Sequence, residues 1–211
     1  MRPLSPGSTP TNRWVPRPFQ ALSLVVGLWL FGSGEAMLVE AEFGNSPWTV
    51  FAQGIATHTP LSIGVMVNII SALVLLLWIP LRQRPGLGTV ASVPLVGISL
   101  DVSLWLIPPA GSLLARVGLC LAGILVVALG SGLYLRCGLG PGPRDGLMTG
   151  IARVSGWPLG ASRALIEVIV LAVGWMLGGV AGVGTLLFAG LIGPCVNIFV
   201  RWQGSAPADH L

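Results

Sequence analysis

The sequence contains few charged residues and no lysine. Charged residues make up 9% of its 211 positions and hydrophobic residues 54%, whereas a soluble domain carries about 25% charged residues. So few charges cannot cover a surface that faces water, and the apolar stretches are too long for a buried core. The composition therefore excludes a soluble domain and indicates an integral membrane protein.

Histidine and cysteine are also scarce, and this limits the available chemistry. The histidines are His58 and His210, while Cys120, Cys137 and Cys195 form no CxxC pair and have no histidine beside them. These spacings do not match metal-ligand sets, and a Ser-His-Asp relay has almost no histidine to use. We therefore expect no metal, no cofactor and no enzymatic activity, and we interpret the cysteines as small apolar residues inside the membrane.

Six apolar segments are long enough to cross a bilayer, which needs about 20 residues at about 1.5 Å each. We predict spans at residues 20–41, 62–81, 87–108, 112–136, 159–178 and 182–202. The first is interpreted as a helix rather than a cleaved signal peptide, because Glu35, Glu40 and Glu42 follow without a small-residue cleavage site. The sequence thus predicts an all-α protein whose surroundings are lipid.

The arginines indicate an orientation. With a cytoplasmic N-terminus, ten of them fall on or near the cytoplasmic side: Arg2, Arg13, Arg17, Arg82, Arg84, Arg136, Arg144, Arg153, Arg163 and Arg201. Arg116 alone falls near the outside. This bias is typical of a bacterial plasma-membrane protein with both termini, residues 1–19 and 203–211, in the cytoplasm. The positive charge therefore needs no nucleic-acid partner.

The chain also contains an internal repeat with a shift of 96 positions. The segment "PGLGTVASVPLVG" (85–97) aligns without a gap on "AGVGTLLFAGLIG" (181–193). Other matched pairs are Gly27 with Gly123, Gly34 with Gly130, Gly44 with Gly140, Pro47 with Pro143 and residues 54–56 with 150–152. Agreement at glycine and proline indicates a duplication of residues 20–108 as 112–202.

An odd number of spans per repeat would invert the second copy. Three spans in each half place the two copies upside down relative to each other, related by a pseudo-two-fold axis in the membrane plane. Inverted repeats of this kind are frequent in secondary transporters. The sequence leaves open whether the chain also forms a homo-oligomer.

Each repeat contains a short segment rich in proline and glycine. These segments, "FGNSPWTVFAQG" (43–54) and "LGPGPRDGLMTG" (139–150), predict helices at 47–57 and 143–155 that begin with proline. Polar residues recur on one face of each helix at i, i+4 and i+8: Thr49, Gln53 and Thr57 in the first, and Asp145, Thr149 and Arg153 in the second.

Two interpretations of these short helices remain open. In one, each is a re-entrant half-helix whose polar face lines a path and whose N-terminal amides face a bound solute. In the other, each is an amphipathic helix lying flat at a membrane surface, with a packing role only. Arg144 and Asp145 can likewise be a plain helix start, since an acidic residue is favourable in a first turn.

Ionisable residues within membrane spans cost free energy of insertion, so each is a candidate for a functional role. Glu35 has no cation nearby in sequence, and Arg116 or Arg136 could reach it. Glu167 follows Arg163 by four residues, which predicts an ion pair on one helix face. Asp101, whose counterpart in the repeat is Asn197, fits an outer-face position or a path-lining carboxylate.

These features favour a small transporter or channel for a polar solute, and an anionic solute is compatible with them. The candidate solute-binding residues are Glu35, Thr49, Gln53, Asp101, Arg144, Asp145, Thr149, Arg153 and Glu167. One alternative is an accessory or scaffold membrane protein, which predicts no central cavity. A weaker one is an intramembrane enzyme acting on a lipid-linked substrate. The "GVGT" segment (182–185) lacks the lysine of a phosphate loop, so we expect its glycines, like Gly86 and Gly88, to serve close helix packing.

Several motifs resemble a known family. The segments "LGPGPRDGLMTG" (139–150), "IEVIVLAVGWMLGG" (166–179) and "GVGTLLFAGLIGP" (182–194), with "GNSPWTVFAQG" (44–54) and "RPGLGT" (84–89), resemble YczE-type bacterial integral membrane proteins, which are related to the YitT group. The resemblance covers about residues 20–200. It implies a multi-span plasma-membrane protein for which transport is the suspected role, and it assigns no role to any residue.

Overall fold

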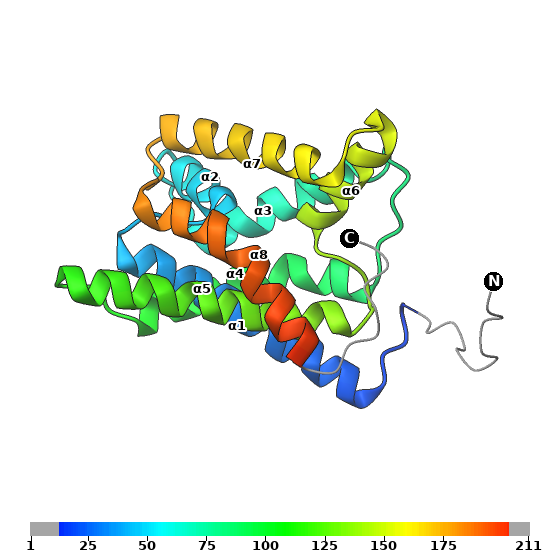
Figure 1. Cartoon of the computed structure of the whole chain (residues 1–211), viewed down its shortest axis with the longest axis horizontal. Coiled ribbons are helices and arrows are strands. Elements are labelled where there is room, and N and C mark those ends of the chain that lie inside the picture. Colours follow the sequence, from blue (N-terminus) through cyan, green and yellow to red (C-terminus); the bar gives the residue numbers. More distant parts are fainter. Residues whose placement is uncertain (1–12, 203–211) are drawn as a thin grey trace.

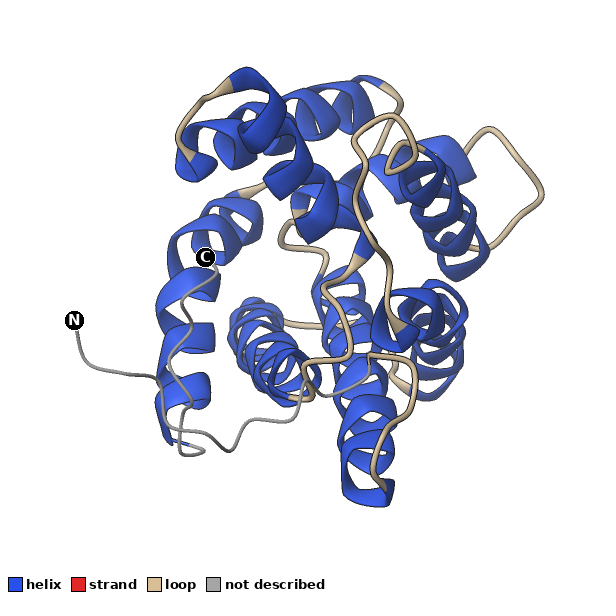
Figure 2. Ribbon diagram, turned by 90° about the vertical axis from the view of Figure 1, so that its right-hand side faces the viewer, coloured by secondary structure: helices blue, strands red, loops and turns tan. Residues whose placement is uncertain are grey.

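The computed structural model describes residues 13–202, and within this range it contains α-helices and no strand (Figures 1 and 2). The helices are α1 (Pro18–Ala41), α2 (Pro47–Ala56), α3 (Ile63–Leu76), α4 (Leu87–Leu106), α5 (Leu113–Arg136), α6 (Pro143–Ser155), α7 (Leu159–Met176) and α8 (Val183–Trp202). The expected tail 203–211 and residues 1–12 of the expected tail 1–19 lie outside the described residues.

Five of these helices, α1, α4, α5, α7 and α8, are long and apolar enough to cross a membrane. The protein is therefore a multi-pass membrane protein. The segment predicted as a span at 62–81 differs, because α3 has 14 residues and is about 21 Å long, short of a hydrocarbon core of about 30 Å. Pro80 explains the early end: it lacks an N–H and disfavours helical backbone at Ile79. Residues 77–82 instead form turns, such as the bond from Ile79 N to Leu76 O of 3.1 Å.

The centre of the bundle is a close antiparallel contact between α1 and α5. A Cβ added at Gly27 would lie 2.9 Å from the carbonyl oxygen of Gly130, and one added at Gly34 would lie 2.8 Å from that of Gly123. Only glycine permits such an approach of two helix backbones. Because positions rise along α1 as they fall along α5, the two helices run in opposite directions.

The other helices pack around this pair. Helix α4 packs on both α1 and α3, α8 packs on α5, and α2 packs against α3 and α7 (Figure 1). Hydroxyl groups join α4 to α1, since Ser99 donates to the carbonyl of Trp29 at 2.7 Å and Ser103 to the hydroxyl of Ser33 at 2.8 Å. These bonds satisfy polar groups that would be costly inside an apolar bundle.

The two short helices begin at the prolines that the sequence indicated. Pro47 and Pro143 are the first residues of α2 and α6, where a missing N–H has no cost. Helix α2 is enclosed by the protein, with Thr49, Val50 and Ala52 fully buried. Helix α6 is half-buried and leaves the bundle at Gly156, which adopts a positive φ of 72°.

The helix starts recur along the chain. Helices α2, α3 and α4 begin at residues 47, 63 and 87, and α6, α7 and α8 begin 96 positions later in each case. Two backbone hydrogen bonds recur as well: Gly88 N donates to Leu139 O at 2.9 Å, and Gly184 N donates to Phe43 O at 2.7 Å. The donors, Gly88 and Gly184, are 96 positions apart, and so are the acceptors, Phe43 and Leu139. Exchanging the two halves of the chain therefore converts one bond into the other. These glycines therefore do permit a close approach, but to the loop backbones that follow α5 and α1 and not between two helices as expected.

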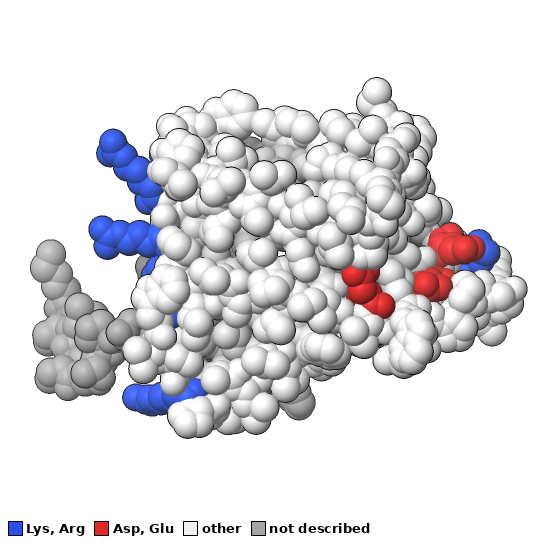
Figure 3. Space-filling model, turned by 180° about the vertical axis from the view of Figure 1, so that it is seen from behind, with Lys and Arg blue, Asp and Glu red and all other residues white. Residues whose placement is uncertain are grey.

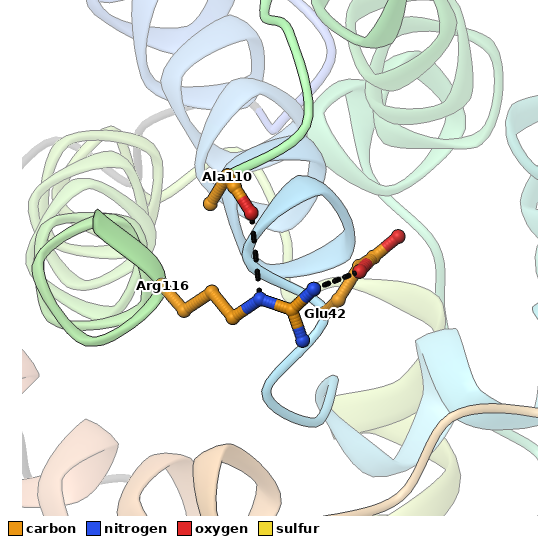
Figure 4. A network of polar contacts seen from close by, with 3 residues as sticks. All are labelled: Glu42, Ala110 and Arg116. Atoms are coloured by element: carbon orange, nitrogen blue, oxygen red, sulfur yellow. Dashed lines mark hydrogen bonds and ion pairs between the residues drawn. The ribbon is translucent and has the colours of Figure 1, made fainter. Parts of the chain in front are cut away.

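On one face of the molecule, basic and acidic side chains lie at opposite ends (Figure 3). Figure 3 shows basic side chains at one end and acidic side chains at the other, where one basic group accompanies them. At the end of α1, Glu42 forms an ion pair of 2.6 Å with Arg116 of α5, which also donates to Ala110 O at 3.4 Å (Figure 4). Arg116 is therefore not the partner of Glu35, as the sequence had allowed.

Candidate functional site

A cavity of about 1230 Å³ lies within the bundle, lined by parts of α1, α3, α4, α5, α6, α7 and α8 and by the start of α2. Six of the candidate residues chosen from the sequence line it: Glu35, Arg144, Asp145, Thr149, Arg153 and Glu167. The structure therefore brings most of the candidates, drawn from both halves of the chain, to one place.

Glu35 is the most deeply buried charged group of the cavity, with 2% of its surface exposed. It lies about 8 Å past the midpoint of α1. Its Oε2 atom accepts hydrogen bonds of 2.7 Å from the hydroxyls of Ser46 and Thr49, at the start of α2. Its Oε1 atom is buried without a partner among the described residues, which is unusual for a buried polar atom.

Arg144 lines the same cavity as Glu35 and lies close enough to interact with its charge. Its guanidinium carbon lies 5.2 Å from the ring centre of Trp48, a distance suited to a cation–π contact. No described residue forms a hydrogen bond with this guanidinium. Burial lowers the pKa of Arg144, while the negative charge of Glu35, and then that of Asp145, opposes the shift. An arginine keeps its charge in such surroundings.

Asp145 occupies the first turn of α6 and accepts a hydrogen bond of 3.0 Å from the hydroxyl of Tyr134. The Tyr134 ring packs edge-on against Phe31, with 6.4 Å between ring centres. Sequence reasoning overlooked Tyr134, although it is the only tyrosine of the chain. It did not select Trp48 or Ser46 as site residues either. Their roles depend on contacts between separate helices, so no local pattern signals them.

The starts of α2 and α6 meet at this place. The two amides after each first proline, at 48 and 49 and at 144 and 145, have no backbone acceptor among the described residues, because the carbonyls four residues earlier lie outside the helix. Such amides and the helix dipole favour negative charge at a helix start. The contact between Trp48 and Arg144 brings both helix starts to the same region.

Three candidates lie nearer the rim of the cavity. Thr149 donates to the backbone of its own helix at 3.1 Å, and Arg153 donates to the carbonyl of Leu81. Glu167 forms an ion pair of 2.9 Å with Arg163. The predicted pairing at i and i+4 is thus confirmed, and it leaves these two charges balanced.

Gln53 and Asp101 lie outside the cavity. Gln53 accepts from the backbone N–H of Val180 at 2.9 Å and so holds the turn after α7 against α2. Asp101 accepts from the N–H of Gly64 at 2.8 Å and from the hydroxyl of Ser62 at 2.5 Å, which ties α4 to the start of α3. Both side chains therefore join segments of the bundle.

The cavity is closed between one pair of helices and open between another. A Cβ at Gly97 of α4 would collide with the backbone of Gly64 and the amide of Asn68, both on α3. At Gly160 of α7 and Gly193 of α8, which occupy the corresponding positions, a Cβ would meet nothing within 4 Å. Both of these glycines line the cavity. The cavity thus separates α7 from α8, whereas α3 and α4 are in contact.

No group of three or more His, Cys, Asp or Glu residues within the described range is placed to hold a metal ion. Among the described residues, the polar groups that gather around the starts of α2 and α6 are the Arg144 guanidinium, the hydrogen-bonded carboxylates of Glu35 and Asp145, and the two helix starts themselves. This arrangement can bind a polar solute by charge and hydrogen bonds.

Comparisons with known proteins agree with the sequence motifs. An "Uncharacterized protein" of Haemophilus influenzae is 39% identical over 191 residues, covering 90% of this chain and 88% of its own. The "Uncharacterized membrane protein YczE" of Bacillus subtilis is 31% identical over 169 residues, 79% of each chain. The "Uncharacterized protein YyaS" of the same species is 25% identical over 179 residues, covering 83% of this chain and 89% of its own.

No solved structure matches the chain. A family model described as "Family of unknown function (DUF6198)" matches residues 19–201. With a match over nearly the whole chain and the similarity to YczE, this membrane protein belongs to the DUF6198 family, within a YczE-like group of relatives.

Proposed function

We propose that the protein is a carrier that moves a small polar solute across the bacterial plasma membrane by opening its cavity to each side in turn. The observation that carries this proposal is the asymmetry of the cavity. It has a charged centre, is closed between α3 and α4, and is open between α7 and α8. A carrier that alternates between two states is expected to have such a cavity, open to one side of the membrane and closed to the other, in each state.

The contacts between the halves support an internal two-fold axis. Gly27 touches Gly130 and Gly34 touches Gly123; a shift of 96 positions exchanges these two contacts. Residues near a two-fold axis also touch their own counterparts, and Trp48 and Arg144, which are 96 positions apart, form such a contact. With antiparallel α1 and α5, this axis lies in the membrane plane, as in the inverted repeats of secondary transporters.

The charge distribution supports an orientation. Arg82, Arg84, Arg153 and Arg163 line the same cavity, and basic residues gather on the cytoplasmic side of such proteins. The cavity then opens to the cytoplasm, both termini are cytoplasmic, and the contact of α3 with α4 closes the outer side. The enclosure of α2 favours re-entrant half-helices over helices lying flat on the surface.

The competing functions fit less well. An accessory protein needs no central cavity, and this cavity has polar groups that the packing leaves without partners. A channel needs a path open at both ends, whereas the glycine contact between α3 and α4 blocks one. A carrier accounts for both features.

A cross-linking experiment tests the required movement. The three native cysteines are replaced by alanine, and Gly160→Cys is combined with Gly193→Cys in membrane vesicles. In the described state α7 and α8 are apart at these positions, so a short bifunctional thiol reagent links them only if the helices approach each other. We expect a cross-link, and we expect it to block cytoplasmic access to a third cysteine introduced by Ser131→Cys, which lies in the cavity.

The control combines Gly160→Cys with Gly190→Cys, which does not line the cavity, and should not cross-link. If the pair at 160 and 193 also fails to cross-link in folded protein, the cavity does not close and the carrier proposal is wrong. Solute flux into proteoliposomes, abolished by the cross-link, is the functional counterpart of this test.

A further inference from the structure

We propose that the centre of the cavity binds a small zwitterion, with its anionic group on Arg144 and its cationic N–H group on Glu35. This inference deepens the proposed function, on which it rests for the need of a solute, and names the chemical class of that solute. It is argued from the unpartnered atoms of the centre, from its charge and from its aromatic wall.

The first argument is the free guanidinium of Arg144. It lies in the cavity, stacked on Trp48, and no described residue accepts its N–H groups. The nearby carboxylate of Asp145 accepts from Tyr134. A guanidinium matches the geometry of a carboxylate or phosphate by two parallel hydrogen bonds. The free amides at the start of α6 add further donors beside it.

The second argument is the free oxygen of Glu35. The side chain is 2% exposed and lines the cavity, and its Oε1 atom has no partner while Oε2 accepts from two hydroxyls. A buried carboxylate oxygen without a donor costs free energy. An ammonium or other N–H group of a ligand would supply that donor.

The third argument is the balance of charge. Arg144 is accompanied by the carboxylates of Glu35 and Asp145, and the starts of α2 and α6 each add about half a positive charge. The centre is then close to neutral but polar, with Glu35 on α1 and with Arg144 and Asp145 next to each other at the start of α6. A simple anion would meet the two carboxylates, and a simple cation would meet Arg144. A zwitterion can place its cationic group next to a carboxylate and its anionic group next to Arg144.

The fourth argument is the wall of the site. Trp48 fixes the guanidinium by stacking on it, and Phe31 lines the cavity beside Tyr134. A largely apolar wall with a few placed polar groups is typical of small-molecule sites. The exposed arginines that also line the cavity, Arg82, Arg84, Arg153 and Arg163, attract the anionic end of an approaching solute.

Binding to the purified protein in nanodiscs tests this inference by thermal stability. The probes are glycine, β-alanine, 4-aminobutanoate and 6-aminohexanoate, which differ in the distance between their charges, with butanoate and butylamine as single-charge references. We expect at least one zwitterion to raise the Tm by about 5–10 °C at a concentration near a hundredfold its Kd. Butanoate and butylamine should give no comparable rise.

Two variants locate the site. Arg144→Gln and Glu35→Gln each remove a charge that would bind one end, and each should weaken zwitterion binding by about tenfold to a hundredfold. Arg116→Gln and Glu42→Gln are the matched controls, because this ion pair lies outside the cavity and its loss should leave binding unchanged. Helix content and size-exclusion profiles verify that all four variants fold.

Several outcomes overturn the inference. Equal stabilisation by butanoate would make the centre an anion site, and equal stabilisation by butylamine would make it a cation site. No stabilisation by any probe, or binding that survives both variants, also contradicts it. Because binding requires no movement of α7 towards α8, a protein that binds a zwitterion but never cross-links at 160 and 193 keeps this site and loses the carrier proposal. A protein that cross-links at 160 and 193 but binds no zwitterion keeps the carrier proposal and loses this site.

Discussion

The pair α3 and α4 and the pair α7 and α8 occupy corresponding places in the two halves of the chain, yet they differ in packing. In the first pair Gly64 and Gly97 bring two helix backbones into contact. In the second pair Gly160 and Gly193 face open space and the cavity lies between the helices. Glycine at a contact position therefore permits a close approach but does not by itself produce one.

The side chains around these glycines explain the difference. In the first pair the amide oxygen of Asn68 accepts from Gly97 N at 3.1 Å, and Asp101 accepts from the start of α3. The corresponding positions hold Ala164 and Asn197. Ala164 has no hydrogen-bonding group, so one polar bond that holds α3 on α4 has no equivalent between α7 and α8. We therefore expect the second pair to separate more easily than the first.

The largest expected effect comes from filling the contact. Gly97→Leu would force a side chain into the backbone of α3, and overpacking of this kind costs about 1–3 kcal/mol of the free energy of unfolding. Gly193→Leu adds the same atoms next to the cavity and should stay within about 0.5 kcal/mol. Thermal unfolding of both variants in detergent is the measurement. Equal losses would mean that α7 and α8 are packed as tightly as α3 and α4.

A second substitution removes the polar link without filling space. Asp101→Ala leaves the N–H of Gly64 and the hydroxyl of Ser62 without their acceptor. Hydrogen bonds to a charged group contribute about 1.5–3 kcal/mol. Because the donors at Ser62 and Gly64 are exposed and partly buried, respectively, we expect a loss near the lower end, about 1.5 kcal/mol, with faster hydrogen exchange at the start of α3. Asn197→Ala, its counterpart, should have a much smaller effect. Slow exchange at Gly64 in the Asp101 variant would contradict this view.

A third substitution adds the missing link to the open pair. Ala164→Asn supplies the amide that Asn68 provides in the closed pair. One hydrogen bond is worth about 1 kcal/mol, which is about fivefold in an equilibrium. The yield of the cross-link between Gly160→Cys and Gly193→Cys should rise by that factor. Ala164→Leu, similar in size, is the control that should give no increase; an equal gain would show that bulk, and not the amide, acts.

The smallest expected effect concerns the ion pair of α7. Replacing Arg163 by valine and Glu167 by serine installs the residues found at the counterpart positions 67 and 71. The Arg163 side chain is 47% exposed, and exposed pairs at i and i+4 contribute about 0.3–0.5 kcal/mol. The double variant should therefore unfold within about 0.5 kcal/mol of the wild type in a calorimetric scan. A loss above about 1.5 kcal/mol would assign the pair a structural role between helices.

Much of the architecture could be predicted because its signals are local. Pro47 and Pro143 start helices since proline suits the first helical position, and the apolar segments give spans by length alone. The prediction for 62–81 was wrong in length because the apolar residues continue past the helix end, where Pro80 interrupts the backbone. Apolar composition marks what lies in lipid, and it does not mark where a helix stops.

The candidate site could be predicted only in part. Glu35 and Arg144 were selected as costly charges near membrane segments, and both line the cavity. Gln53 was selected from a helical stripe that the structure buries against the turn after α7. A stripe shows which residues share a helix face, but it does not show what that face contacts.

The amino-acid sequence alone determined that the chain is a membrane protein, where its helices begin and which positions match at a shift of 96. Hydropathy, proline and glycine act over a few neighbouring residues, so these features can be recognised locally. Only the packing of the helices decided that Trp48 meets Arg144, that Ser46 and Thr49 hold one oxygen of Glu35, and that one helix pair is closed while its counterpart is open. Those contacts join groups far apart in the chain, and their free energies depend on distances of a few ångströms that no local pattern specifies.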